Sequence, residues 1–70
     1  MNLGELRERA NLTQQELAEL LEVNRVTIAR YERGEREPSI QTIIQIATHL
    51  CITTDEVIRA LLEAKKEEPQ

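Results

Sequence analysis

The sequence has few of the residues that support a large core or a covalent framework. Its 70 residues include no Trp, no Phe and a single Tyr, so the core must be small and aliphatic. One cysteine excludes an intrachain disulfide, and one His together with that cysteine is too few for a metal site. We therefore expect no metal, no cofactor, and a marginally stable domain that a second copy of the chain would support.

Membrane and catalytic signals are missing as well. No apolar run approaches the ~20 residues that cross a bilayer, and no basic segment followed by an apolar one opens the chain. We therefore expect a cytoplasmic protein with no membrane partner. Beyond the lone His49 and Cys51 there is no pairing of a nucleophile with a base, and no Gly-rich loop that would hold a phosphate. These absences argue against an enzyme.

Helical spacing is the main pattern that the sequence does contain. The chain has two Gly and two Pro and no strand-like alternation, and its apolar residues recur three and four positions apart. Each run follows a residue that can cap a helix: Asn2, Thr13, Asn24, Ser39 and Thr53. Two of these caps are followed by a Glu at the capping-box position, at Glu16 and Glu56. We predict an all-α domain of five short helices over residues 1–62, followed by a frayed or disordered tail over residues 63–70.

The second and third predicted helices are joined by a very short turn, of about three residues after Leu21. Two short helices joined so tightly favour a helix-turn-helix, whose second helix enters the major groove in DNA-binding proteins. The pattern of this motif lies in residues 12–18 (LTQQELA), 23–28 (VNRVTI), 31–34 (YERG) and 38–39 (PS), with residues 6–7 before them and 50–58 after them. On these segments the chain resembles the Cro and lambda-repressor type (XRE) helix-turn-helix family, over nearly all of its length outside the tail.

The resemblance implies a five-helix, lambda-repressor-like fold and a sequence-specific transcription regulator of the repressor or controller type. Such a protein binds a two-fold symmetric double-stranded DNA operator as a homodimer and is found on the nucleoid when bound. The base-reading positions of the family fall on Asn24, Arg25, Val26, Thr27 and Arg30. Its phosphate-binding positions fall on Gln14, Arg33 and Arg36. Arg7 and Glu32 match an ion pair that joins the first helix to the third.

Helical geometry gives an independent view of the third helix. At ~100° per residue, with Ile28 at the centre of the buried side, the opposite face carries Val26, Ala29, Arg30 and Arg33. This face has two Arg and no acid, in a chain whose net charge is −4. Arg can donate two hydrogen bonds to guanine, and Val can cover a thymine methyl group.

Each of these functional interpretations has a plainer alternative. The Arg side chains can form an ordinary solvated face, Gln14 can be a solvated first-turn residue, and Val26 can pack into the core. Arg36 can pair with its neighbours Glu35 and Glu37 instead of a phosphate. Arg7 and Glu32 can be two independent surface charges, although Glu32 lies on the inward side, where an unpaired carboxylate is costly.

The fourth and fifth predicted helices carry wider apolar stripes than one packing partner needs. We expect part of this surface to meet a second copy across a two-fold axis, and the candidate residues are Ile44, Ile52, Ile58, Leu61 and Leu62. The alternative is that these side chains fill the core of a monomer. A further alternative concerns function, because an acidic chain repels DNA at long range. The domain would then be an antitoxin-like or anti-repressor module whose main partner is a protein such as a toxin.

Two helix ends lack the glycine that commonly stands there in the family. Glu22 follows the second helix and Cys51 follows the fourth, whereas Gly34 follows the third. If the turns keep the family's geometry, Glu22 and Cys51 both adopt the left-handed conformation, which glycine adopts without strain.

Overall fold

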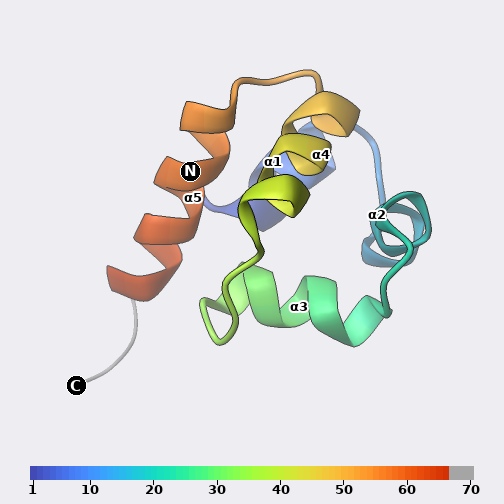
Figure 1. Cartoon of the computed structure of the whole chain (residues 1–70), viewed down its shortest axis with the longest axis horizontal. Helices are drawn as coiled ribbons and strands as arrows, with labels where there is room; N and C mark the ends of the chain where they lie inside the picture. The colour runs from blue at the N-terminus through green and yellow to red at the C-terminus, as the bar shows by residue number, and fades with distance from the viewer. Residues whose placement is uncertain (67–70) are drawn as a thin grey trace.

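The computed structural model describes residues 1–66, and within that range the chain forms five helices and no strand. They are α1 (Leu3–Arg9), α2 (Gln14–Leu21), α3 (Arg25–Arg33), α4 (Ile40–Leu50) and α5 (Thr54–Lys66). The predicted all-α fold is confirmed. In Figure 1, α3 lies along the lower edge of the molecule, α2 lies beside its beginning, and the loop after α3 runs toward the end of α5.

The helices begin where the sequence predicts. Four of the five predicted caps accept the expected backbone N–H through their side chains, at 2.9–3.2 Å: Asn2, Thr13, Ser39 and Thr53. The fifth, Asn24, has the extended backbone of an N-cap but its side chain makes no capping bond. Its amide is therefore not used in starting α3.

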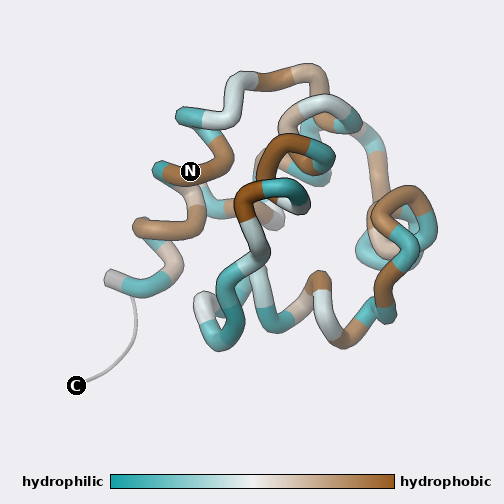
Figure 2. Tube along the Cα trace, in the orientation of Figure 1, coloured by the Kyte–Doolittle hydropathy of each residue, from teal (hydrophilic) through white to brown (hydrophobic). Residues whose placement is uncertain are grey.

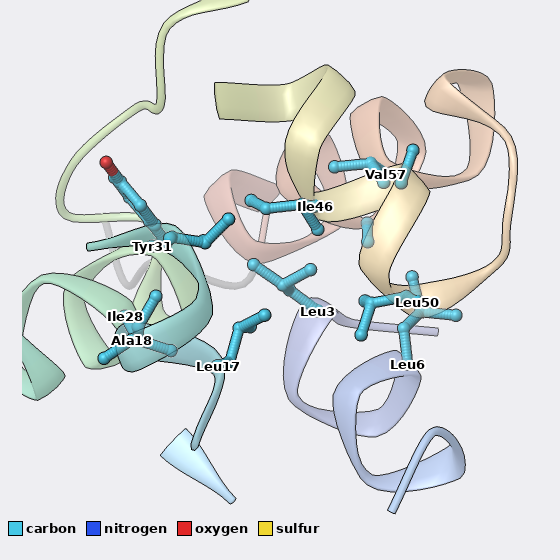
Figure 3. Packing of buried hydrophobic residues seen from close by; sticks show 12 residues of the cluster. Leu3, Leu6, Leu17, Ala18, Ile28, Tyr31, Ile46, Leu50 and Val57 are labelled. Carbon is cyan, nitrogen blue, oxygen red and sulfur yellow. The ribbon is translucent and has the colours of Figure 1, made fainter. Parts of the chain in front are cut away.

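Every helix contributes one of the largest completely buried side chains to a single core. These residues are Leu3, Leu17, Ile28, Ile46 and Val57, and Figure 3 shows how they meet. Full burial of one such side chain contributes about 1.5–3 kcal/mol, so this cluster ties all five helices together. Tyr31 is 5% exposed, and its phenol oxygen points away from Leu3 and Ile46 (Figure 3). Ile28 and Tyr31 thus fix α3 against the rest of the domain.

Three of the helices end at residues in the left-handed conformation. The prediction for Glu22 and Cys51 is confirmed, since both have φ of 58°, and Gly34 has φ of 75°. A fourth such residue, Asn11 with φ of 60°, was not predicted. Asn tolerates this region better than most residues with a Cβ, so the turn between α1 and α2 is under less strain than the two turns that begin at Glu22 and Cys51.

The fifth helix is longer than predicted. It continues through Lys66, so residues 63–66, which we expected in a frayed or disordered tail, belong to the helix. Ala64 is buried, and a Cβ on Gly34 would lie 3.1 Å from its carbonyl carbon. Glu37, in the loop after α3, forms an ion pair with Lys65. The end of α5 therefore supports the loop that follows α3, and the rest of the expected tail, residues 67–70, lies outside the described residues.

Candidate nucleic-acid interface

A tight turn aims α3 across the end of α2. Glu22 provides the left-handed step, and the Val23 N–H donates to the Ala18 carbonyl at 2.9 Å. The next helix then starts at Arg25, with Ile28 fully buried at its centre. This geometry leaves the opposite side of α3 at the edge of the molecule, as Figure 1 shows.

Two of the predicted base-reading residues, Val26 and Arg30, lie on this outward side. Val26 is 49% exposed, which excludes the alternative that it packs into the core. Asn24, Arg25 and Arg30 are exposed as well, and Thr27 is half-buried. The prediction for Ala29 was wrong, because it is 8% exposed and belongs to the buried side. It follows Ile28 by only ~100° around the helix, and its methyl group is too short to extend past the edge of the buried face.

The positive charge of this side is less free than the sequence indicates. Arg33 donates to both carboxylate oxygens of Glu35, at 2.9 and 3.2 Å. These hydrogen bonds hold the pKa of Glu35 below its usual value and raise the pKa of Arg33. An acid from the next turn therefore reaches a face that we expected to be free of acids. Arg33 can contact a phosphate only by giving up or sharing this partner.

Two arginines remain without such a partner. The sequence left open an ion pair of Arg36 with Glu35 or Glu37, but Glu35 pairs with Arg33 and Glu37 with Lys65. Within residues 1–66, neither Arg30 nor Arg36 forms an ion pair or a side-chain hydrogen bond. Both side chains are exposed and can turn toward a ligand.

A chain of hydrogen bonds links α1, α2 and α3 behind this surface. Arg7 Nε lies 2.7 Å from Glu32 Oε2, so the two residues form an ion pair and are not independent surface charges. Gln14 Nε2 donates to the other carboxylate oxygen of Glu32 at 3.0 Å, and Arg25 Nη1 donates to Gln14 Oε1 at 3.4 Å. Gly4 leaves room for the carboxylate, because a Cβ there would lie 3.1 Å from Glu32 Oε1. Gln14 is therefore held by protein partners, and the alternative that it is a freely solvated residue is wrong.

A second surface, away from α3, is apolar. Three of the predicted dimer-interface residues are well exposed, Ile44 (52%), Ile58 (43%) and Leu62 (52%), whereas Ile52 and Leu61 are half-buried against the core. Figure 2 shows hydrophobic positions along both α4 and α5. A hollow of about 150 Å³ between them is lined by Pro38, Ile43, Ile58, Leu61 and Leu62, with Glu37 and Lys65 at its rim. Ile40 is 78% exposed but was not among the predicted dimer-interface residues. Its position at the start of the apolar run of α4 could have indicated it.

Other kinds of site have no basis in the part of the chain that the structure covers. No helix there is long and apolar enough to span a bilayer. The His, Cys, Asp and Glu side chains of that part form no group of three that could hold a metal ion.

Comparison with known proteins agrees with this geometry. A helix-turn-helix family model matches residues 3–57. The chain is similar to the uncharacterized HTH-type transcriptional regulator YqaE of Bacillus subtilis, at 36% identity over 83% of this chain and 50% of that protein. It is also similar to the HTH-type transcriptional activator BcrR of Enterococcus faecalis, at 38% identity over 80% of this chain and 28% of that protein. A third relative is the HTH-type transcriptional regulator ImmR of Bacillus subtilis, at 32% identity over 94% of this chain and 52% of that protein.

The chain thus spans about half of two of these relatives, and less of the third. All three are named as transcriptional regulators or activators and none as an enzyme. The family model covers the two helices and the turn whose geometry is described above, together with α1, α4 and the start of α5. The chain therefore belongs to the helix-turn-helix family of the Cro and lambda-repressor (XRE) type.

Proposed function

We propose that this protein is a sequence-specific transcription regulator, of the repressor or controller type, that binds double-stranded DNA as a homodimer on a two-fold symmetric operator. One observation carries the proposal. Arg30 and Val26 are exposed on the outward side of α3, where Arg30 has no ion-pair partner within residues 1–66, beside the N-terminus of α2. A protein with this function acts on the nucleoid, in the cytoplasm.

The outward side of α3 has the chemistry that reads bases in the major groove. Arg30 is free to donate two hydrogen bonds to guanine O6 and N7. Val26 offers an apolar contact to a thymine methyl group, and Asn24 offers an amide that is not used in capping. Thr27, which is half-buried, contributes a hydroxyl group nearby. Arg25 starts the same helix but differs from these four, because it donates a hydrogen bond to Gln14.

The groups that would contact DNA phosphates lie at the two ends of this surface. Gln14 is the first residue of α2, where unpaired backbone N–H groups and the helix dipole favour an anion. Arg36 is exposed in the loop after α3, which the end of α5 supports. Arg33 joins them once Glu35 releases it. Phosphate contacts position the protein and give affinity that falls with salt, whereas base contacts select the sequence.

The apolar surface on α4 and α5 supports the dimer. Ile40, Ile44, Ile58 and Leu62 are all exposed there, and a monomer rarely leaves large apolar side chains together in water. An isologous contact through this surface would place two α3 helices on one operator, which gives the two-fold symmetric recognition.

The alternative is a module whose main partner is a protein, such as a toxin. The net charge of −4 favours it, as does the occupation of Arg33 by Glu35. A protein partner would need no exposed, unpaired arginine on α3, and Arg30 therefore favours DNA. The two functions give different results in the experiment that follows.

Affinity measurements on arginine variants test the proposed function. The wild-type chain is first used to select a duplex from a random library, and fluorescence anisotropy then gives affinities for that duplex and for a scrambled one. Arg30→Ala should cost about 1–3 kcal/mol on the selected duplex and little on the scrambled one. Arg36→Ala should weaken both about equally and make the salt dependence shallower, by about 0.9 in the slope of log K against log salt.

The matched control is Arg9→Ala, which removes the same charge from α1. Arg9 is exposed and lines a hollow beside Leu50 and Cys51, away from α3. This variant should bind both duplexes like the wild type. If Arg30→Ala and Arg36→Ala also kept wild-type affinity, or if the wild type selected no sequence, the protein-binding alternative would replace the proposal.

A further inference from the structure

Arg25, the first residue of α3, is hydrogen-bonded to α2 instead of pointing freely outward. Arg25 Nη1 donates to Gln14 Oε1 at 3.4 Å, and Gln14 is the first residue of α2. Arg30, one turn and a half further along α3, has no such tie within residues 1–66. The guanidinium group of Arg25 is therefore drawn toward the start of α2.

The carboxylate of Glu32 sets which way the Gln14 amide faces. A carboxylate can only accept hydrogen bonds, so Gln14 must turn its Nε2 toward Glu32 Oε1, and the measured distance is 3.0 Å. Gln14 Oε1 is then left on the other side, facing Arg25. Glu32 itself is fixed by Arg7 at 2.7 Å, and both of these side chains are largely buried, with 11% and 13% exposed. The orientation of Gln14 thus follows from an anchored group.

This orientation makes Gln14 alone a poor phosphate ligand. A phosphate oxygen is an acceptor, and both Gln14 Oε1 and Glu32 Oε1 are acceptors that would face it with negative charge or a lone pair. A donor and a positive charge between these oxygens and the phosphate remove the conflict. Arg25 supplies both, and the sum of formal charges on Arg7, Glu32 and Arg25 becomes +1, whereas Arg7 and Glu32 alone cancel.

We infer that Arg25 is a phosphate-binding residue which Glu32 positions through Gln14, and that it does not read a base. Arg25 and the N-terminal N–H groups of α2 hold one backbone phosphate together. Base selection then rests on Arg30 and Asn24, whose side chains form no hydrogen bond or ion pair within residues 1–66, and on Val26. This inference rests on the proposed function, because it assigns one contact of the same DNA-binding surface.

Replacing Arg25 by Lys and by Ala separates the two roles. Lys keeps a point charge but loses the planar fork that recognises guanine, so it preserves a phosphate contact and destroys a bidentate base contact. Arg25→Lys should therefore bind both the selected and the scrambled duplex within about twofold of the wild type. Arg25→Ala should lose the same factor on both duplexes. Because one phosphate contact contributes about 0.9 to the salt slope, that factor should shrink about 3.5-fold when salt rises fourfold.

Two further variants test the positioning by Gln14 and Glu32. In a double-mutant cycle of Arg25→Ala and Gln14→Ala, the two losses should not add, because each removes part of the same contact. Glu32→Gln no longer forces Gln14 to turn its Nε2 toward residue 32, so Arg25 is less firmly positioned but keeps its charge. Its salt slope should therefore become shallower, but by less than that of Arg25→Ala. Arg9→Ala is again the control for lost charge. Circular dichroism at the assay temperature shows whether each variant is folded.

Three results would overturn the inference while leaving the proposed function intact. They are a loss on the selected duplex alone in Arg25→Ala, an affinity of Arg25→Lys as low as that of Arg25→Ala, and fully additive losses in the cycle. Either of the first two would return Arg25 to the base-reading set, and the third would show that Gln14 does not position Arg25. A wild-type chain that selects no duplex overturns the proposed function itself, and the inference with it.

Discussion

Replacing Glu32 by Gln tests how strongly the ion pair with Arg7 holds α3 in place. The carboxylate accepts one bond from Arg7 Nε at 2.7 Å and one from Gln14 Nε2 at 3.0 Å. Removing one partner of a fully buried pair costs about 3–5 kcal/mol, since the other charge stays buried and unpaired. These side chains are slightly exposed, and Arg7 keeps a second bond to the Leu12 carbonyl at 2.6 Å. We therefore expect Glu32→Gln to lower the free energy of unfolding by about 2–3 kcal/mol.

Urea and thermal melts followed by circular dichroism measure this loss. For a chain of this size, the loss corresponds to a melting temperature lower by about 10–20 °C. Glu8→Gln is the matched control, because Glu8 is exposed on α1 and changes by the same charge. It should stay within about 0.5 kcal/mol of the wild type. A loss just as small in Glu32→Gln would show that the ion pair does not hold α3 in place.

A double replacement distinguishes an unpaired charge from lost packing. Arg7→Met with Glu32→Leu removes both charges while keeping apolar volume, and such replacements of buried pairs are often neutral or stabilising. The double variant should therefore recover most of the stability that Glu32→Gln loses. If it were less stable than the single variant, the hydrogen bonds to Leu12 and Gln14 would matter more than the buried charge.

Four further substitutions concern two turns, an ion pair and the apolar surface. Glu22→Gly should raise the free energy of unfolding by up to ~1 kcal/mol, because φ there is 58° and Gly adopts it without strain; a loss in urea melts would contradict this. Cys51→Gly should behave alike, since that side chain is exposed. Glu35→Gln frees Arg33 and should tighten DNA binding in anisotropy assays, with a salt slope about 0.9 steeper. Because Arg33 lowers the pKa of Glu35, the carboxylate is neutralised only at a pH below the usual range of Glu, and only there should the DNA affinity of the wild type equal that of Glu35→Gln. If Glu35→Gln bound DNA no more tightly than the wild type, Arg33 would not reach DNA. Leu62→Glu should leave circular dichroism unchanged but give a monomer in sedimentation, and an intact dimer would place the interface elsewhere.

The sequence predicted the backbone better than the site. Caps and apolar spacing are local signals, and they located the five helices and the left-handed residues Glu22 and Cys51. The end of α5 was missed because its last turns carry one small buried residue, Ala64, among charged ones. Apolar periodicity gives little signal there, and the packing of Ala64 under Gly34 depends on residues far apart in the chain.

Side-chain partners on the surface were the hardest part to predict. Arg33 pairs with Glu35 across the turn at Gly34, and this depends on the direction in which the chain leaves α3. The contact of Arg25 with Gln14 depends on the angle between α2 and α3, which spacing along the sequence does not specify. Helical geometry alone also misplaced Ala29. It gives the angle of a residue around the helix axis, but it does not say how far neighbouring residues extend and cover a short side chain.

In the proposed function, the outward side of α3 reads the major groove through Arg30. Replacing guanines of the selected duplex one at a time by 7-deazaguanine removes only the N7 acceptor, which lies in that groove. The affinity of the wild type and of Arg30→Ala for each such duplex then gives a double-mutant cycle between one side chain and one atom. We predict one guanine per half-site at which the base change weakens the wild type but leaves Arg30→Ala unaffected. Additive losses at every guanine, or no loss at any of them, would show that Arg30 does not read a guanine in the major groove.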